Sequence, residues 1–396
     1  MRLYRPTADA VVDALQQIFV EKKYADKVIE KTLKRNPPWR PHDRQFIAET
    51  IYDIVRWYRF FRNASNAKGD DFWLLFATWC ASQHIDLPAW KEFSSVPYTE
   101  LKKRVHQNHP TRKINESIPD WLDELGEQEL GKRWDNELTS LNEEASVVLR
   151  VNTLRTTVKK LQEKLEEQEI FTTTHQDFPD ALILEEHRNV FQLPEFKEGL
   201  FEVQDAGSQS ISRFANPTPG MRIIDACAGG GGKTLHLAAL IQNKGRIIAM
   251  DTEQWKLDEL KKRARRAGVS TIETRIIDSS KAVKRLEKSA DLVLLDVPCS
   301  GIGVLRRNPD AKWKLSPQYL EQVKAEQQKI LSSYSAMVKP GGMLVYATCS
   351  VFYSENEEQV KKFLQEKPSF SLMEEKRIWP SEGFDGFYMA SLKRIS

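Results

Sequence analysis

Apolar residues recur at helical spacing through the first 85 residues of the chain. One stripe runs from Val11 to Phe19 and another from Phe46 to Tyr58. Side chains three and four positions apart share one face of a helix, so these stripes predict packed amphipathic helices. Prolines interrupt residues 86–119, where we expect irregular structure and a boundary, and helical spacing returns between Pro119 and Asn142.

The pattern changes at residue 147, where a β-branched run predicts a strand over 147–152. A helix over 158–167 and a strand over 181–184 complete a small α/β module. From residue 203 onward, short apolar runs alternate with helical segments, which is typical of a doubly wound, mostly parallel sheet. The predicted strands of this sheet are 221–226, 246–251, 271–278, 291–297, 342–348, 369–373 and 387–392, and its predicted helices are 234–242, 252–267, 280–288 and 316–338.

With 396 residues, the chain is longer than one compact core usually holds. We expect three parts: an all-helical segment over residues 1–118, a helical linker with a small RRM-like α/β module over 119–204, and a Rossmann-like domain over 205–396. The longest apolar runs, such as 292–295, are far shorter than the roughly 18 residues that cross a bilayer. We therefore expect no membrane association, and a monomer suffices.

The composition is that of an ordinary soluble protein, with 40% hydrophobic residues, 29% charged residues and a net charge of +3. Four cysteines form no C-x-x-C pair and are too sparse for a disulfide framework, so we expect reduced thiols and a cytoplasmic location. Basic residues cluster from Lys31 to Arg44 and from Lys261 to Arg266. Such clusters can follow phosphates, but each alone is more typical of a solvated helix face.

A glycine-rich loop, Cys227–Lys233, joins the predicted strand 221–226 to the helix after it. Successive glycines let a ligand approach the backbone, and the helix N-terminus offers free N–H groups. Asp251 ends the next strand, where a carboxylate can accept hydrogen bonds from both ribose hydroxyls. A phosphate-binding loop would need glycine at position 227, which is cysteine, so this alternative is disfavoured.

Asp278 and Asp296 end the two strands that follow. Each alone is typical of a helix cap. Together with Asp251 they form a row of carboxylates along one edge of the sheet, which fits an adenosine pocket with Asp278 near the adenine amine. No metal site is expected.

Cys299 and Cys349 each follow a short apolar run, so both are expected at strand ends on the same edge of the sheet. A cysteine thiolate can add to C6 of a cytosine and thereby make C5 nucleophilic enough to accept a methyl group. Asp296 is placed to assist at N3 of the base. A buried cysteine is often only a small hydrophobe, but two at matching strand ends favour chemistry.

The segment after Cys299 contains Arg306 and Trp313, which can contact phosphate and stack on a base. Ordinary packing explains Trp313 equally well. We take Arg306, and Arg44 from the first basic cluster, as candidate RNA contacts.

Four motifs in this order resemble the RNA cytosine-5 methyltransferase family, the group that contains ribosomal RNA small subunit methyltransferase B. They are Phe201–Gln209, the glycine loop, Asp296–Gly303 continuing to Asp310, and Tyr346–Ser350. The resemblance implies a Rossmann-like S-adenosylmethionine-dependent methyltransferase domain, with Cys349 as nucleophile and Cys299 assisting product release. It assigns cofactor binding to Cys227, Ala228, Gly229, Gly230, Gly231, Gly232, Lys233, Asp251, Asp278 and Asp296.

One departure stands out, because Gly229 and Gly230 occupy positions where the family usually has alanine and proline. Extra glycine loosens the unliganded loop, so we expect weaker cofactor affinity rather than altered chemistry. The N-terminal helices around Arg44 are weakly similar to the NusB-type RNA-binding domain of some members.

Four alternatives remain. Ribosomal RNA is the favoured substrate and transfer RNA the second. A DNA-type enzyme would use Cys299 as nucleophile, whereas an amino-methylating enzyme would need Asn/Asp-Pro-Pro-Tyr in place of Asp296–Cys299. A non-catalytic ribosome-assembly factor would need neither cysteine.

Overall fold

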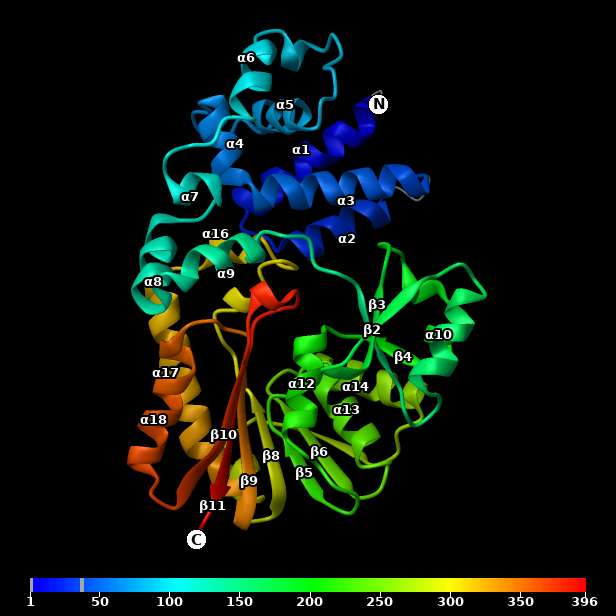
Figure 1. Ribbon diagram of the computed structural model, residues 1–396, viewed down its shortest axis with the longest axis vertical. Helices are drawn as coiled ribbons and strands as arrows, with labels where there is room; N and C mark the ends of the chain where they lie inside the picture. The colour runs from blue at the N-terminus through cyan, green and yellow to red at the C-terminus, as the bar shows by residue number, and fades with distance from the viewer. Residues whose placement is uncertain (1–2, 36–38) are drawn as a thin grey trace. The chain divides into compact units, whose positions relative to one another are not determined.

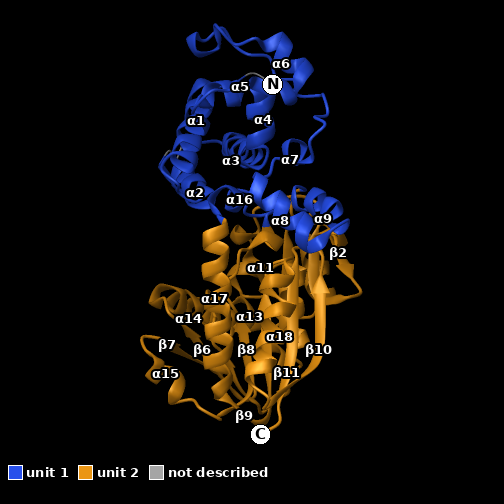
Figure 2. Ribbon diagram, turned by 90° about the vertical axis from the view of Figure 1, so that its left-hand side faces the viewer, with its two compact units in different colours: residues 1–143, 305–316 blue, residues 144–304, 317–396 orange. Residues whose placement is uncertain are grey.

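The computed structural model describes residues 3–35 and 39–396 and divides into two compact units. Unit 1 comprises residues 1–143 and 305–316, and unit 2 comprises residues 144–304 and 317–396 (Figure 2). This division differs from the three consecutive parts predicted, because residues 305–316 fold with the N-terminal helices. In the described part of the chain, no helix is long and apolar enough to cross a membrane.

Unit 1 is helical, and its core is built from the predicted stripes. Val11 and Leu15 of the first stripe and Ile47 and Ile51 of the second are fully buried in one cluster, which also contains Cys80. The helices of this part are α1 (Arg5–Phe19), α2 (Ala25–Arg35), α3 (Pro41–Arg56), α4 (Tyr58–Ser65) and α5 (Phe72–Ser82).

Residues 86–119 are more ordered than the prolines suggested. They contain a 3₁₀ turn, η1 (Lys91–Phe93), and the helices α6 (Tyr98–Arg104) and α7 (Arg112–Asn115). These pieces are too short to show helical periodicity, so the sequence pattern could not predict them. Unit 1 then continues into α8 (Asp120–Leu130) and α9 (Arg133–Leu141).

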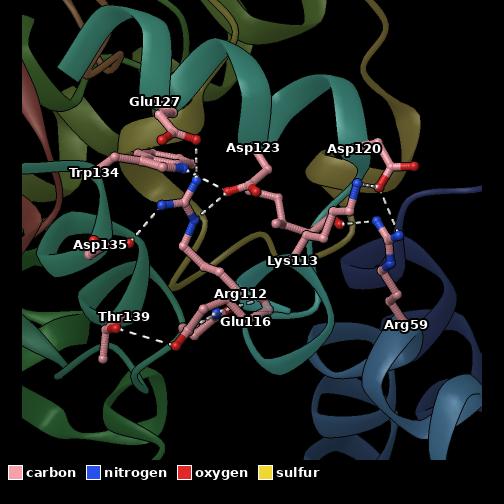
Figure 3. Close-up of polar contacts among 12 residues, drawn as sticks. Arg59, Arg112, Lys113, Glu116, Asp120, Asp123, Glu127, Trp134, Asp135 and Thr139 are labelled. Atoms are coloured by element: carbon pink, nitrogen blue, oxygen red, sulfur yellow. Dashed lines mark hydrogen bonds and ion pairs between the residues drawn. The ribbon is translucent and has the colours of Figure 1, made fainter. Parts of the chain in front are cut away.

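One arginine ties these short helices together (Figure 3). The Arg112 guanidinium on α7 donates to Asp123 at 2.8 Å and Glu127 at 2.9 Å, both on α8, and to Asp135 on α9 at 2.8 Å. Asp123 also accepts a hydrogen bond from the indole of Trp134 at 3.0 Å. The hydrogen bond to Asp123, opposed by burial and reinforced by the other two carboxylates, raises the pKa of Arg112. Side-chain hydrogen bonds therefore hold α7, α8 and α9 together, because helices this short are not stable through helix propensity alone.

The segment 305–316, including α16 (Ala311–Lys314), completes the core of unit 1. Arg306 donates from Nε to the carbonyl oxygen of Ser140 at 2.5 Å. The Trp313 indole donates to the carbonyl oxygen of Val55 at 2.7 Å. Lys312 is fully buried, and desolvation holds its pKa well below the usual value. The segment is therefore an integral part of the helical unit.

Unit 2 contains two sheets. The smaller has the strand order β2-β3-β1-β4 and is antiparallel throughout. Its strands β2 and β4 were not predicted, since β2 is polar and β4 has only three residues. The elements of this module are β1 (Val148–Val151), α10 (Val158–Glu166), β2 (Thr172–His175), β3 (Phe178–Leu184), η2 (Val190–Gln192), α11 (Pro194–Lys197) and β4 (Phe201–Val203).

The larger sheet has seven strands in the order β10-β11-β9-β8-β5-β6-β7 (Figure 1). Strands β7, β6, β5, β8 and β9 are parallel, and β11 pairs antiparallel with β9 and β10. This confirms the predicted doubly wound, Rossmann-like class. Its strands are β5 (Arg222–Asp225), β6 (Arg246–Asp251), β7 (Ile272–Ile276), β8 (Ala290–Asp296), β9 (Val338–Thr348), β10 (Phe370–Ile378) and β11 (Phe387–Arg394).

Both faces of this sheet are buried, which is why its central strands read as continuous apolar runs. Ile224 and Val293 belong to the cluster beneath α17 and α18, whereas Ile223 and Leu292 belong to the cluster beneath α12 and α13. Helix α18 was not predicted. The helices and turns are α12 (Ala206–Phe214), α13 (Gly232–Leu240), α14 (Gln254–Ala267), α15 (Ser280–Lys284), η3 (Ile302–Val304), α17 (Pro317–Tyr334), η4 (Ser335–Met337), η5 (Tyr353–Glu355), α18 (Glu357–Glu366) and η6 (Pro380–Glu382).

Gly126 on α8 provides a test of packing against helix propensity. A Cβ atom at this position would lie 2.1 Å from Cε2 of the fully buried Trp134. Gly126→Ala should therefore lower the free energy of unfolding by about 1–3 kcal/mol through overpacking, although alanine favours helix by about 1 kcal/mol. Thermal unfolding of the full chain measures the change. Exposed Gln128→Ala on the same helix is the control, and an unchanged or raised melting temperature for Gly126→Ala would contradict the prediction.

Candidate active site

Strand β5 lies at the point where the order of the large sheet reverses, because it pairs with β6 on one side and β8 on the other. Ligands of open α/β sheets bind beyond the carboxyl ends of the strands at this point. The glycine loop Cys227–Lys233 follows β5 directly. Gly229 and Gly231 have φ angles of +54° and +87°, which glycine adopts at low cost.

Neighbouring groups fix the shape of this loop. A Cβ atom at Gly231 would lie 2.5 Å from Cγ of Leu260, so the loop and α14 pack too closely for a side chain. Arg263 donates to the carbonyl oxygen of Gly230 at 2.7 Å. The loop is thus held from outside, even though glycine replaces the proline usual at position 230.

A cavity of 1160 Å³ lies in unit 2 beside the loop. Cys227, Asp251, Ile277 and Pro298 are among its lining residues, so the ends of four parallel strands contribute to it. The Asp251 carboxylate accepts from the backbone N–H groups of Gly229 and Glu253, both at 2.9 Å, which fixes its position at the cavity wall.

Asp278 is exposed, and Ser279 donates to its carboxylate at 3.0 Å. Its neighbours Ile277 and Ser279 line the cavity. Asp278 therefore lies at the rim of the cavity, whereas the sequence pattern predicted it as part of the cavity lining.

The two cysteines meet at the same edge of the sheet. The Sγ atoms of Cys299 and Cys349 are 3.1 Å apart, and the backbone N–H of Cys349 donates to Sγ of Cys299 at 3.3 Å. Lys233 forms an ion pair with Asp296, with 2.5 Å between Nζ and Oδ2, and its Nζ lies 5.6 Å from the centre of the Phe387 ring. The predicted convergence of these strand ends is thus confirmed in its geometry.

Hydrogen bonds, burial and nearby charges set the protonation states of this group. The hydrogen bond to Cys349, and then burial, raise the pKa of Cys299 well above its usual range. Burial, the largest single cause, lowers the pKa of Lys233, but the charge and hydrogen bond of Asp296, with the charges of Cys349 and Asp225, together outweigh burial and leave the pKa raised. At neutral pH, Cys299 therefore keeps its proton and Lys233 stays charged.

A close backbone contact holds the loop that carries Cys299. The N–H of Gly303 donates to the carbonyl oxygen of Cys349 at 2.9 Å, and its carbonyl oxygen accepts from Gly386 at 2.7 Å. A Cβ atom at Gly303 would lie 2.2 Å from the carbonyl oxygen of Gly386. Only glycine fits here, so the two cysteine loops and the start of β11 are locked together.

Some residues of the site had no signal in the sequence. Phe387 lies far along the chain from Lys233, and Glu355 lies far from Ser300, so only the sheet topology reveals these contacts. Asp225 is fully buried at the end of β5, where Thr234 donates to its Oδ2 at 2.7 Å. Burial, with a smaller contribution from Asp296, raises the pKa of Asp225 to about 7.

The candidate RNA contacts lie in other surroundings. Arg306 is only 4% exposed and donates to a backbone carbonyl inside unit 1, so its assignment as a phosphate contact is corrected to a structural role. Trp313 packs edge-on against Tyr58 at 5.5 Å, which favours the packing alternative. Arg44 is half-buried and donates to the carbonyl oxygen of Leu33 at 3.1 Å, and it stays a prediction.

Asp225→Asn should change how stability depends on pH. An unfolded aspartate releases its proton near pH 3.9, whereas Asp225 keeps it to about pH 7, so stability from this group is lost as the pH rises between these values. Asparagine cannot titrate and removes this loss. The free energy of unfolding in urea should therefore favour the variant more at pH 8 than at pH 5, and an equal difference at both values would contradict the assigned pKa.

Comparisons with known proteins show the family of this chain. A family model described as 16S rRNA methyltransferase RsmB/F matches residues 213–393, and one for the ferredoxin-like domain of such proteins matches residues 118–191. A probable ribosomal RNA small subunit methyltransferase B from Synechocystis is 32% identical, over 94% of this chain and 90% of that protein.

A second curated relative and a solved structure are also similar to this chain. Ribosomal RNA small subunit methyltransferase B from Vibrio cholerae is 35% identical over 70% of this chain and 65% of its own length. The crystal structure of PH0851 has a TM-score of 0.85 and 26% identity, with both chains fully covered. The chain therefore belongs to the RsmB/F family of ribosomal RNA methyltransferases, and it is an S-adenosylmethionine-dependent RNA methyltransferase.

Proposed function

We propose that this enzyme methylates C5 of a cytosine in ribosomal RNA through a covalent bond between Sγ of Cys349 and C6 of the base. The observation that carries the proposal is the 3.1 Å separation of two thiols at the strand ends beside the cofactor loop. Methylation of an exocyclic amine needs no thiol, and simple RNA binding needs none either. A paired thiol site therefore favours addition to an aromatic ring.

The cavity beside the glycine loop fits S-adenosylmethionine. Its volume is ample for a nucleoside ligand, Asp251 presents a carboxylate for the ribose hydroxyls, and Ile277 and Pro298 offer apolar surface to adenine. We assign the backbone of Cys227–Gly232 to the amino-acid end of the cofactor and Asp278 to the adenine rim. When bound, the cofactor supplies an electrophilic methyl group.

Cys349 is the nucleophile in this proposal. The raised pKa of Cys299 leaves its proton on sulfur, so its S–H can donate to a Cys349 thiolate. Lys233 contributes a nearby positive charge. Addition of the Cys349 sulfur to C6 shifts electron density to N3 and C5, and the Lys233–Asp296 pair can deliver a proton or hydrogen bond to N3.

Cys299 assists the second half of the reaction. After C5 has accepted the methyl group, loss of the C5 proton to a base restores the aromatic ring and expels Cys349 as a thiolate. The Cys299 S–H lies 3.1 Å from the departing sulfur and stabilises it by a hydrogen bond. Phe387, beside Lys233, is buried in the core and supports this edge of the site from behind.

The choice of ribosomal RNA rests on the relatives, whose names specify the small ribosomal subunit. Transfer RNA is the second candidate, and a cytoplasmic site of action follows if assembling ribosomes carry the target. The target cytosine has to be unpaired or flipped from its helix to reach two thiols at the end of the sheet.

Asp251→Asn should weaken cofactor binding. A neutral amide replaces the carboxylate that accepts from the ribose hydroxyls, so we expect the Kd for S-adenosylhomocysteine to rise about tenfold or more. Isothermal titration calorimetry measures it. Exposed Asp258→Asn on α14 is the control, and an unchanged Kd for Asp251→Asn would place the ribose elsewhere.

Cys349→Ala should abolish methylation, and Cys299→Ala should accumulate a covalent protein–RNA adduct because the leaving sulfur has lost its donor. Incubation with labelled S-adenosylmethionine and total RNA, followed by denaturing gels, measures both outcomes. Cys80→Ala, in the core of unit 1, is the control and should retain methylation without trapping RNA.

Other outcomes of this experiment identify the alternatives. An adduct that forms only in Cys349→Ala would make Cys299 the nucleophile, as in DNA-type enzymes. Transfer of label to transfer RNA alone would change the substrate. A wild-type enzyme that labels no RNA, while the cofactor binds, would favour an assembly factor.

A further inference from the structure

A buried carboxylate lies directly behind the two cysteine loops. Glu355 is 0% exposed, at the end of η5. Its Oε1 accepts from the backbone N–H of Ser300 at 2.7 Å and from the Gln327 amide at 3.0 Å. Its Oε2 accepts from the hydroxyl of Ser300 at 2.5 Å and from the hydroxyl of Ser350. All four of these donors are neutral groups.

These donors belong to the loops that carry the reactive thiols. Ser300 is the residue after Cys299, and Ser350 is the residue after Cys349. The two hydroxyl oxygens are themselves only 3.3 Å apart. One carboxylate therefore connects two loops that are fifty residues apart in sequence.

The carboxylate is held in place from several directions. Gln327 on α17 donates to the carbonyl oxygen of Pro298 at 2.9 Å as well as to Glu355. The Tyr346 hydroxyl donates to the main-chain oxygen of Glu355 at 2.7 Å. The next residue, Asn356, donates to the carbonyl oxygen of Ser350 at 2.9 Å. The position of Glu355 is thus set in part from outside the two loops, by Gln327 on α17 and Tyr346 on β9.

A buried carboxylate contributes little net stability to a fold. Removal of a charged carboxylate from water costs several kcal/mol, and neutral donors return only part of it. An apolar residue would fill the same volume at lower cost. What an apolar residue cannot do is fix both loops by directional hydrogen bonds.

We propose that Glu355 is a positioning residue that sets the separation of the Cys299 and Cys349 sulfur atoms. Without it, the two loops would still meet at the backbone hydrogen bond from Gly303 to Cys349, but they would lose the carboxylate that links Ser300 to Ser350. The distance between the thiols would then vary, and Cys299 would spend less time within reach of the departing Cys349 sulfur. The catalytic consequence rests on the proposed two-cysteine function, whereas the structural one does not.

The test measures how fast the two thiols form a disulfide, because this rate depends on the separation of their sulfur atoms. Diamide accepts two hydrogen atoms from two thiols to give a disulfide and the reduced hydrazine, and the sulfurs must close from 3.1 Å to a bond of about 2.05 Å. Mass spectrometry of alkylated peptides follows the rate at which the Cys299–Cys349 disulfide forms. RNA and cofactor are not needed, so the result does not depend on methyl transfer.

We expect rapid cross-linking in the wild type. In Glu355→Ala, once its folding is confirmed by thermal unfolding, we expect a rate that is lower by a factor of about ten or more. Ser350→Ala, which removes one link and leaves the carboxylate in place, should give an intermediate rate even if Glu355→Ala fails to fold. Glu355→Gln should restore part of the rate, since its amide can accept from Ser300 and donate to the hydroxyl oxygens. Exposed Glu358→Gln is the matched control and should behave as wild type.

A parallel measurement of turnover separates this proposal from the proposed function. The clamp that Glu355 forms between Ser300 and Ser350 predicts a lower kcat for Ser350→Ala and Glu355→Gln with an unchanged KM for S-adenosylmethionine. Equal cross-linking rates in the wild type and all folded variants would overturn the role of Glu355. Absence of methylation by the wild type, with the cross-linking order intact, would overturn the proposed function and leave the clamp standing.

Discussion

The site depends on the parallel pairing of three strands in register. Strand β8 pairs with β5 on one side and β9 on the other, with Leu294 opposite Asp225 and Asp296 opposite Ala347. Parallel strands end at the same edge, so the cofactor loop and both cysteine loops start from one line. A slip of one residue in β9 would send the side chains after it to the other face. Chemistry here is a consequence of register.

Strand register brings the three loops to one edge of the sheet, and close backbone contacts and buried charges then fix their positions there. Gly303 lets three loops touch at their main chains, since a side chain of any size would separate them. Lys233 and Asp296 put opposite charges beside the thiols without leaving either uncompensated. The edge of the sheet is therefore rigid where the thiols are held and polar where a base would enter.

Much of this could be predicted from local sequence pattern. Apolar runs bounded by loops gave β6 at its observed bounds and placed Asp251, Cys299 and Cys349 at strand ends, because burial on both faces leaves a strong local signal. Arg306 was misread for the opposite reason. Its neighbours in sequence look like an exposed basic loop, and only the distant carbonyl of Ser140 and carboxylate of Glu143 show why an arginine is buried there.

The basic run on α14 shows the same limit. Arg263 and Arg266 both form ion pairs with Glu202 of β4, at 2.9 and 2.5 Å. Arg213 of α12 similarly binds Asp180 of β3 at 2.6 Å. These pairs join the small sheet to the helices of the large one, alongside the apolar cluster in which Phe178 and Ile211 are buried together. No pattern confined to one segment could have shown that these charges are used internally.

The insertion of residues 305–316 into unit 1 has a consequence for how the protein is made and dissected. A fragment that stops at residue 143 lacks the Trp313 indole and the Arg306 guanidinium, so the carbonyl groups of Val55 and Ser140 lose these donors. During synthesis, the helical unit lacks these two hydrogen bonds until the ribosome has passed residue 316. The N-terminal helices therefore emerge first but gain their last contacts only after the Cys299 loop has been made.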